Sequence, residues 1–398
     1  MDANEHEWQR GTELIIRIVL CCRFLVVFEV VELQVAKEKC MKALTKDEVE
    51  GIKNHLLSLS REDGGFDASP LKGYRGIADS RVSDLAATVY VAEIGLTMGF
   101  ELPEEKKTIE YIQARQRPEG NFHPIEDYGF DAASQKELSF YNTCMGLRGL
   151  KVFNKYPKYD PKPFLEKIVR EDFKIGKFSP PYAPDMVANA YAAIDEEMPK
   201  DCEGKLGEFL LRYQEEKTGW ILQKKLSEEF GNTWSYPFER NNPMTFHAAR
   251  FFHLVGKEIP MAEKILETFM KVQEDDGSWK LGNVHGTFDA IVTLRMLSDN
   301  SEKYKNAIKR GAEWALSCQR PGGGFNHFGN NKPPATNQPD KSWSDSHPAE
   351  EQFPPEVDAC YFHIATLVMA GMIPTKLNSK NRWIGWGHTL INRSYGHE

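Results

Sequence analysis

The stretch Met270–Trp279 reads MKVQEDDGSW and is the clearest copy of a pattern that recurs along the chain. In each copy an apolar helical segment is followed by a turn, a glycine and an aromatic residue. The further copies are LLSLSREDGGF (56–66), IQARQRPEGNF (112–122), VREDFKIGKF (169–178), LLRYQEEKTGW (210–220) and LSCQRPGGGF (316–325). Such regular recurrence identifies an internal repeat, which is typical of stacked or ring-shaped architectures.

Each repeat is long enough for two helices with short connections. The segment before the turn carries apolar residues at helical spacing, for example Ile265, Leu266 and Phe269. The segment after the turn begins polar and becomes apolar, and no alternating run indicates a sheet. We therefore predict an all-α fold, an α/α toroid. It would be a double ring of five to six helical hairpins, with the second helix of each hairpin in the inner ring. An open solenoid is the alternative.

The recurrent turn residues suit structural roles. Glycine allows the tight backbone at a helix end, and the aromatic side chain packs on the neighbouring repeat. Glutamine can bond the exposed backbone groups of adjacent helix ends. The glutamines in question are Gln116, Gln214, Gln273 and Gln319. We expect these residues to brace the scaffold and to take no part in catalysis.

Composition limits the function classes. The formal net charge is −8, and no long basic run occurs, so no nucleic-acid partner is expected. The seven cysteines are irregularly spaced without a C-x-x-C pair, which indicates reduced thiols and a cytoplasmic protein. The 398-residue chain can bury a large core. We assign that core to a toroid domain over residues 46–398, with an inserted loop at 326–357.

Residues 1–45 form an N-terminal extension with one apolar segment, residues 14–31. Arg17, Arg23 and Glu29 interrupt that segment. A charged residue near the centre of a bilayer costs roughly 3 kcal/mol, so a transmembrane span is not expected. We predict a peripheral helix on the toroid. An interfacial membrane anchor is the alternative.

Two turns carry a family resemblance. QEDDGSW at Gln273–Trp279 is similar to the QW motif of squalene and hopene cyclases. QRPGGGF at Gln319–Phe325 resembles the corresponding turn of protein prenyltransferase β subunits. The resemblance covers roughly residues 46–371 and implies the toroid fold. Because the turns are shared by proteins with different chemistry, they do not define a reaction.

Three further segments resemble the prenyltransferase branch. Asp358-Ala359-Cys360-Tyr361 is similar to the D-x-C-Y segment that supplies two zinc ligands and a tyrosine that contacts diphosphate. His285-Gly286 resembles the H-G pair that contacts the isoprenoid diphosphate, and His388-Thr389 resembles the H-T pair of the third zinc ligand. The resemblance thus implies zinc held by Asp358, Cys360 and His388, and catalysis by Asp358, Cys360 and Tyr361.

The implied activity is that of a transferase. Zinc with one open position would activate a substrate thiol, which would take the isoprenoid from its diphosphate. The resemblance also implies a separate helical α subunit as partner. His285 and Tyr361 are the expected substrate contacts, and we add Trp234 and Arg295 as an aromatic and a cationic candidate. The family's cations before the D-x-C-Y segment are missing here, since residues 350–357 read EEQFPPEV.

Other interpretations stay open. Asp358 could cap its helix and Cys360 could simply pack in the core. The ring could instead bind or process glycans through carboxylates and aromatic platforms. The residues for that function would be Asp84, Asp185, Asp289 and Asp358, with Trp234, Tyr236 and Trp343. A non-catalytic scaffold is a further alternative. Acid-initiated terpene cyclisation is not expected, because the chain has no D-x-D-D segment.

Overall fold

A computed structural model describes residues 44–71, 83–123, 132–172, 182–230, 241–279, 283–298, 302–328 and 354–373. The chain divides into two units, Met1–Ala43 and Leu44–Glu398, and all described residues belong to the second. The predicted N-terminal helix at 14–31 therefore lies outside the described residues. Within the ranges described, no helix is both long and apolar enough to cross a membrane.

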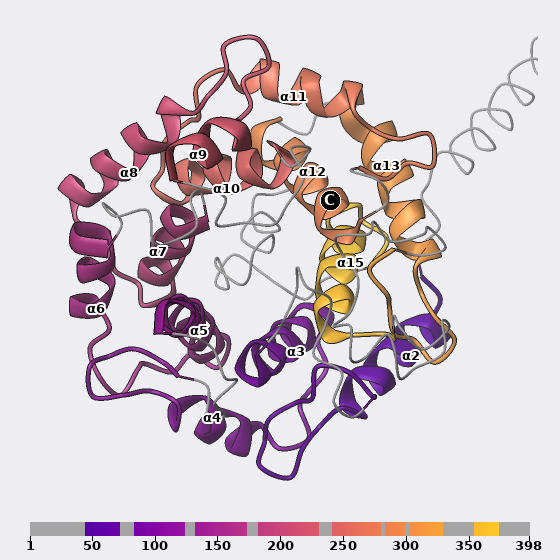
Figure 1. The fold of residues 1–398 in the computed structure, drawn as a ribbon. Helices are drawn as coiled ribbons and strands as arrows, with labels where there is room; N and C mark the ends of the chain where they lie inside the picture. The colour runs from indigo at the N-terminus through magenta and orange to yellow at the C-terminus, as the bar shows by residue number, and fades with distance from the viewer. Residues whose placement is uncertain are drawn as a thin grey trace, which may run out of the picture. The chain divides into compact units, whose positions relative to one another are not determined.

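Helices of the second unit form two concentric layers (Figure 1). The inner helices are α3 (Asp84–Met98), α5 (Ala132–Val152), α7 (Tyr182–Ala193), α10 (Asn241–Leu254), α12 (Val284–Leu297) and α15 (Val357–Met369). Outside them lie α2 (Lys46–Leu57), α4 (Glu105–Gln113), α6 (Lys162–Lys167), α8 (Lys200–Arg212), α11 (Ala262–Lys271) and α13 (Glu302–Ser317). A π-helical turn, η1 (Ile168–Asp172), continues α6, and α9 (Gln223–Phe230) precedes α10. The described chain contains no named strand, which confirms the all-α prediction.

The inner helices close into a ring. Each packs against the next in the order α3, α5, α7, α10, α12, α15, and α15 packs against α3 again. Two backbone hydrogen bonds join the first repeat to the last, from Leu44 N to Met372 O (3.1 Å) and from Val357 N to Ala68 O (2.9 Å). An open solenoid would leave its end repeats apart. The closed toroid is therefore confirmed.

Burial follows the two layers. The outer helix α11 buries one face, with Ile265, Leu266 and Phe269 in the core between the rings. The inner helix α12 is buried over nearly its whole length. Outer helices consequently show helical apolar spacing, whereas inner helices read as almost continuous apolar runs. This difference explains the two kinds of segment seen around each turn in the sequence.

The turn glutamines bind two repeats at once. Gln273 Nε2 donates to Gly277 O of its own turn and to Ala307 O of α13, both at 2.8 Å. Gln116 bonds Gly120 O and Tyr159 O in the same manner, at 3.2 and 2.7 Å. Each of these two glutamines thus joins its own turn to a backbone carbonyl of the next hairpin.

Each of the five turns that the structure describes to its end is also attached to the inner helix that follows it. The backbone N–H at the end of the turn donates to a side chain on that helix. The pairs are Phe66 with Thr88 (3.0 Å), Phe122 with Thr143 (2.9 Å), Ile221 with Thr245 (3.0 Å), Trp279 with Thr287 (3.1 Å) and Phe325 with Cys360 Sγ (3.3 Å). We call Thr88, Thr143, Thr245, Thr287 and Cys360 the turn-binding residues. They set a common register for five inner helices.

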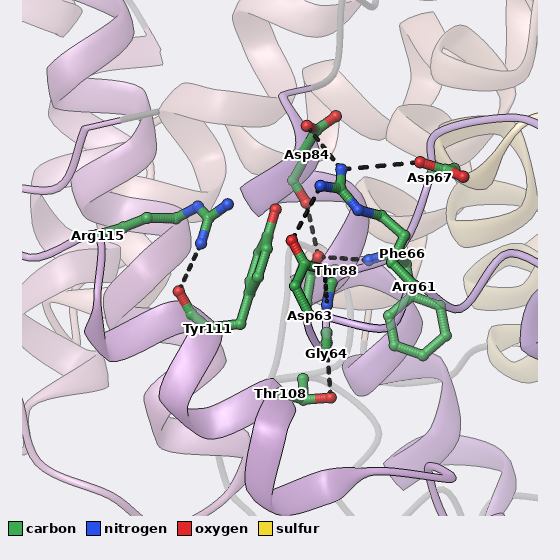
Figure 2. Close-up of polar contacts among 11 residues, drawn as sticks. Arg61, Asp63, Gly64, Phe66, Asp67, Asp84, Thr88, Thr108, Tyr111 and Arg115 are labelled. Carbon is green, nitrogen blue, oxygen red and sulfur yellow. Dashed lines mark hydrogen bonds and ion pairs between the residues drawn. The ribbon is translucent and has the colours of Figure 1, made fainter. Parts of the chain in front are cut away.

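Figure 2 shows this attachment in the first repeat. Thr88 accepts from the Phe66 amide, and Thr108 of the next outer helix donates to Gly64 O at 2.9 Å. Arg61 reaches across the turn to Asp84 at the start of α3, with 3.0 Å between Nη1 and Oδ2. Outer turn, inner helix and neighbouring hairpin are therefore held at one point by side chains as well as by packing.

Candidate functional site

The register of the inner helices brings two of the predicted site residues together. His285 on α12 lies two residues before the turn-binding Thr287, and Asp358 on α15 lies two residues before the turn-binding Cys360. The two side chains therefore occupy equivalent positions on adjacent helices. His285 Nε2 lies 2.9 Å from Asp358 Oδ2.

A second histidine joins this pair from the turn before α15. His327 follows the QRPGGGF turn, and its carbonyl accepts from Val284 N at 3.0 Å, which fixes it beside the start of α12. His327 Nε2 lies 3.6 Å from Asp358 Oδ2 and 2.5 Å from an oxygen of Glu356. The rings of His285 and His327 meet edge to face, with centroids 5.2 Å apart. We call His285, His327, Glu356 and Asp358 the α12–α15 cluster.

The cluster is withdrawn from solvent. The side chains of His327, Glu356 and Asp358 are 1%, 2% and 5% exposed, and only His285, at 22%, has appreciable access. Burial raises the pKa of Glu356, although the neighbouring His327 opposes this effect. Two carboxyl groups and two imidazoles thus share a buried region where any charge change is strongly felt.

Three of these side chains fit a metal ion. The ligand atoms of His285, His327 and Asp358 all lie within 4.8 Å of one another. Tetrahedral zinc, at about 2.0–2.2 Å from nitrogen and oxygen ligands, places those atoms roughly 3.3–3.6 Å apart. The 2.9 and 3.6 Å separations to Asp358 lie close to that requirement. Two imidazoles and one carboxylate form a ligand set typical of catalytic zinc with an open position.

Cys360 lies elsewhere. Its sulfur accepts from the backbone N–H of Phe325, and the residue is fully buried. Burial raises the pKa of this thiol to about 12. The D-x-C-Y resemblance implied that Asp358 and Cys360 share one zinc ion. The structure brings Asp358 to two histidines and places the Cys360 sulfur against the outer turn.

The helix-cap interpretation of Asp358 does not hold. Helix α15 begins at Val357 with Glu356 as the N-cap residue, and the Glu356 side chain makes no capping hydrogen bond. Asp358 is already inside the first turn. Its carboxylate is directed to His285 and His327 and does not bond the end of its own helix.

Tyr361 belongs to a buried polar network. Its ring stacks on Tyr90 of α3, with centroids 4.2 Å apart, and its hydroxyl accepts from Arg148 Nη2 of α5 at 3.2 Å. Arg148 also forms a bidentate ion pair with Glu93 of α3, at 2.9 and 2.6 Å. The network joins the three inner helices α15, α3 and α5 and fixes the position of the tyrosine hydroxyl.

Aromatic rings continue from the cluster along the inner wall. Phe362 packs against His285 (4.6 Å between centroids), Phe288 (4.8 Å) and Tyr361 (5.2 Å). Phe288 in turn meets Phe246 of α10 at 5.6 Å. Phe288, Phe246 and Tyr361 are buried, and Phe362 is partly exposed beside His285. Aromatic faces of this kind pack well against apolar chains and stabilise positive charge.

Arg295 does not join this site. Its Nε donates to Met369 O, in the last turn of α15, at 3.1 Å. Asp358 lies in the first turn of the same helix, about 16 Å away along the axis at 1.5 Å per residue. The structure therefore places Arg295 at the opposite end of α15, where it binds a helix carbonyl.

The carboxylates proposed for glycan chemistry are bound to the scaffold. Asp84 pairs with Arg61. Asp185 binds both Arg250 and His247, with 2.7 Å to His247 Nδ1. Asp289 is buried in α12. Asp358 alone of the four lies in the α12–α15 cluster. The aromatic platforms Trp234, Tyr236 and Trp343 lie outside the described residues.

His388, the third predicted zinc ligand, also lies outside the described residues, as does most of the 326–357 loop. Two members of the cluster, His327 and Glu356, were not identified from the sequence. Both lie within that loop, one near each end, so most of the loop separates them along the chain. In the sequence, only their position could have indicated them, because His327 lies two residues after the motif residue Phe325 and Glu356 two residues before Asp358.

Comparison with known proteins agrees with this architecture. The sequence matches the family profile described as prenyltransferase alpha-alpha toroid domain over residues 23–130, 186–336 and 283–392. No curated protein matches the sequence. Type II terpene cyclase MstE from Scytonema, in complex with geranylgeranyl dihydroxybenzoate, is similar in structure at 14% identity. Its TM-score is 0.50, with 82% of this chain and 97% of that chain covered.

A protein from Actinoplanes is similar at 15% identity and a TM-score of 0.50, over 82% of this chain and 99% of that one. Protein geranylgeranyltransferase-I from Candida albicans, complexed with GGPP, has 11% identity and a TM-score of 0.49, over 79% and 92% of the chains. At such identities the two likenesses with a TM-score of 0.50 describe the fold alone. The family profile, which spans well over half of the sequence, identifies the chain as a member of the prenyltransferase α/α toroid family.

Proposed function

We propose that this chain is a zinc-dependent transferase that moves an isoprenoid from its diphosphate to a thiol. The observation that carries the proposal is the convergence of His285, His327 and Asp358 at the start of two inner helices, beside an aromatic wall. Zinc in such a set keeps one position open and lowers the pKa of a thiol that enters it.

The reaction forms a bond between the thiol sulfur and C1 of the isoprenoid, and breaks the bond between C1 and the diphosphate oxygen. The proton of the thiol passes to the Glu356 carboxylate, which lies 2.5 Å from His327 Nε2 and is therefore next to the proposed zinc. Phe362, the partly exposed ring that packs against His285, contacts the isoprenoid chain and faces the positive charge that develops at C1.

In this proposal the buried polar network of Tyr361, Arg148 and Glu93 stabilises the diphosphate leaving group. The Tyr361 hydroxyl, which accepts from Arg148, can donate its own proton to a diphosphate oxygen. Arg148 is already paired with Glu93, so its positive charge is partly neutralised. A helical α subunit that contributes further cations belongs to the same proposal.

The test uses purified chain and cell extract in parallel, so that a partner is present in one arm. Zinc content is measured by mass spectrometry, and transfer from farnesyl or geranylgeranyl diphosphate to a peptide thiol is followed by chromatography. We expect stoichiometric zinc and a thioether product, both lost in Asp358→Asn. A folded wild-type protein that makes no thioether in either arm would refute the proposed activity.

Acid-initiated cyclisation is the second candidate, and a specific observation favours it. The missing D-x-D-D segment argued against this chemistry, yet Glu356 and Asp358 supply two buried carboxyl groups two residues apart. Burial keeps Glu356 protonated to higher pH, and an aromatic wall lies beside the pair. A protonated carboxyl there could donate to the terminal double bond of a polyprenyl chain.

Chelation separates the two candidates. A cyclase of this kind keeps its activity after zinc is removed and loses it in Glu356→Gln. It also releases no diphosphate from its substrate. The transferase shows the opposite response to chelation and releases one diphosphate for each thioether formed.

A further inference from the structure

We propose that the metal ligands of this chain are His285, His327 and Asp358, with the Glu356 carboxylate beside them, and that Cys360 is a scaffold residue in place of threonine. The inference depends on the proposed metal ion but not on the proposed isoprenoid transfer. It replaces the ligand set that the D-x-C-Y resemblance implies.

Position in the repeat supports the assignment of Cys360. In four other repeats a threonine hydroxyl accepts from the turn amide at 2.9–3.1 Å, and Cys360 Sγ accepts from the same point of its own turn at 3.3 Å. The longer distance is that of the larger sulfur atom. Cys360 is thus the fifth turn-binding residue, in a position whose role is the same around the ring.

Helix geometry then separates Cys360 from Asp358. Successive residues of an α-helix are turned by about 100°, so positions two apart face directions about 200° apart. A side chain that reaches the outer turn therefore leaves the position two residues earlier facing the ring interior. His285 stands in that position relative to Thr287, as Asp358 does relative to Cys360, so the two inward positions converge at 2.9 Å.

The remaining members are fixed by backbone bonds. Val284 N donates to His327 O at 3.0 Å, and Glu356 N donates to Phe325 O at 3.2 Å. Glu356 lies 2.5 Å from His327 Nε2. That nitrogen cannot keep this contact and bind an ion at the same time, so ion binding would release the Glu356 carboxylate beside the metal and leave one coordination position open. Four side chains from α12, the turn and the start of α15 are therefore held in place before any ion binds.

The contacts of the Cys360 sulfur point the same way. The sulfur accepts from the Phe325 backbone N–H at 3.3 Å, and the residue is fully buried. The imidazole and carboxylate atoms of His285, His327 and Asp358, by contrast, converge within 4.8 Å of one another. The sulfur therefore serves the fold as the acceptor for the Phe325 amide.

The test measures metal binding to the full chain, with Zn²⁺ and Co²⁺ as the probes. We expect one ion per chain and no thiolate-to-cobalt charge-transfer band in the near ultraviolet. Cys360→Thr should keep wild-type affinity and melting temperature, because the hydroxyl restores the bond that the other repeats use. Cys360→Ala should keep the affinity and lower the melting temperature.

His327→Gln and His285→Gln should each weaken binding by ~100-fold or more, since loss of an outer contact alone costs up to ~100-fold. Circular dichroism confirms that these variants are folded. A charge-transfer band that disappears in Cys360→Thr would overturn the inference, as would a folded wild-type chain that binds neither ion. Metal binding at the predicted residues without thioether formation would leave this inference standing and refute only the proposed function.

Discussion

The closure of the ring can be tested at two adjacent glycines. Gly322 and Gly323 lie in the last turn, and both have left-handed backbone, with φ of 95° and 97°. A Cβ added at Gly322 meets no atom within 4 Å, whereas one added at Gly323 would lie 2.1 Å from the backbone C and O of Gly51 in α2. The two positions therefore share the left-handed backbone, and only Gly323 contacts the first repeat.

The structure gives the expected magnitudes. Alanine in a left-handed conformation costs roughly 1–2 kcal/mol, which is all that Gly322→Ala should lose. Gly323→Ala adds an overlap with backbone that no side-chain rotation can relieve, and overpacking of this kind costs ~1–3 kcal/mol or more. We expect Gly323→Ala to lose about 3–5 kcal/mol in total, the sum of these two costs at its upper end.

Urea unfolding followed by far-ultraviolet circular dichroism compares the two variants directly. Gly322→Ala is the matched control, since it carries the same backbone strain one residue away. The closed ring predicts a clearly lower urea midpoint for Gly323→Ala. Equal midpoints for the two variants would refute the close approach of the last turn to α2, and with it the argument for closure.

Three other predictions concern the scaffold. Gln273→Ala removes bonds to the Gly277 and Ala307 carbonyls and should lower the unfolding free energy by about 2–3 kcal/mol; a loss near zero in urea unfolding would contradict the brace. Arg148→Met leaves Glu93 buried without its partner and should cost about 3–5 kcal/mol, most of it recovered when Glu93→Met is added; no recovery in the double variant would refute the pairing. Burial lowers the pKa of His363 from 6.5 to about 3. Below pH 6.5 this histidine therefore binds a proton in the unfolded chain but not in the folded one, so the free energy of unfolding decreases as the pH falls. Between pH 7 and pH 5 the titration of His363 should lower the free energy of unfolding by about 2 kcal/mol. The free energy of unfolding of His363→Gln should decrease correspondingly less over the same pH range, as measured by urea unfolding.

The sequence supported the fold strongly because the fold repeats. Gln273 and Gly277 have counterparts in other turns, and each copy serves the same backbone bonds between hairpins. Helical spacing in segments such as Ile265–Phe269 then separates outer helices from inner ones. Because the same pattern occurs several times within one chain, chance similarity between single segments cannot explain it.

The site was only partly predictable, since it does not repeat. His285 and Asp358 were found because both stand where inner helices begin. His327 and Glu356 were missed because a long loop separates them along the chain, and their meeting depends on how that loop returns. The orientation of Cys360 also depends on three-dimensional register. The threonines at its counterpart positions, such as Thr287, become informative once their bonds to the turns are known.

Anomalous diffraction at the zinc edge, from crystals grown with Zn²⁺, tests the central claim most directly. We expect one peak about 2.0–2.2 Å from His285 Nε2, His327 Nε2 and Asp358 Oδ2, with the Cys360 sulfur still bonded to the Phe325 amide. A peak at bonding distance from Cys360 Sγ, or none near His327, would contradict it.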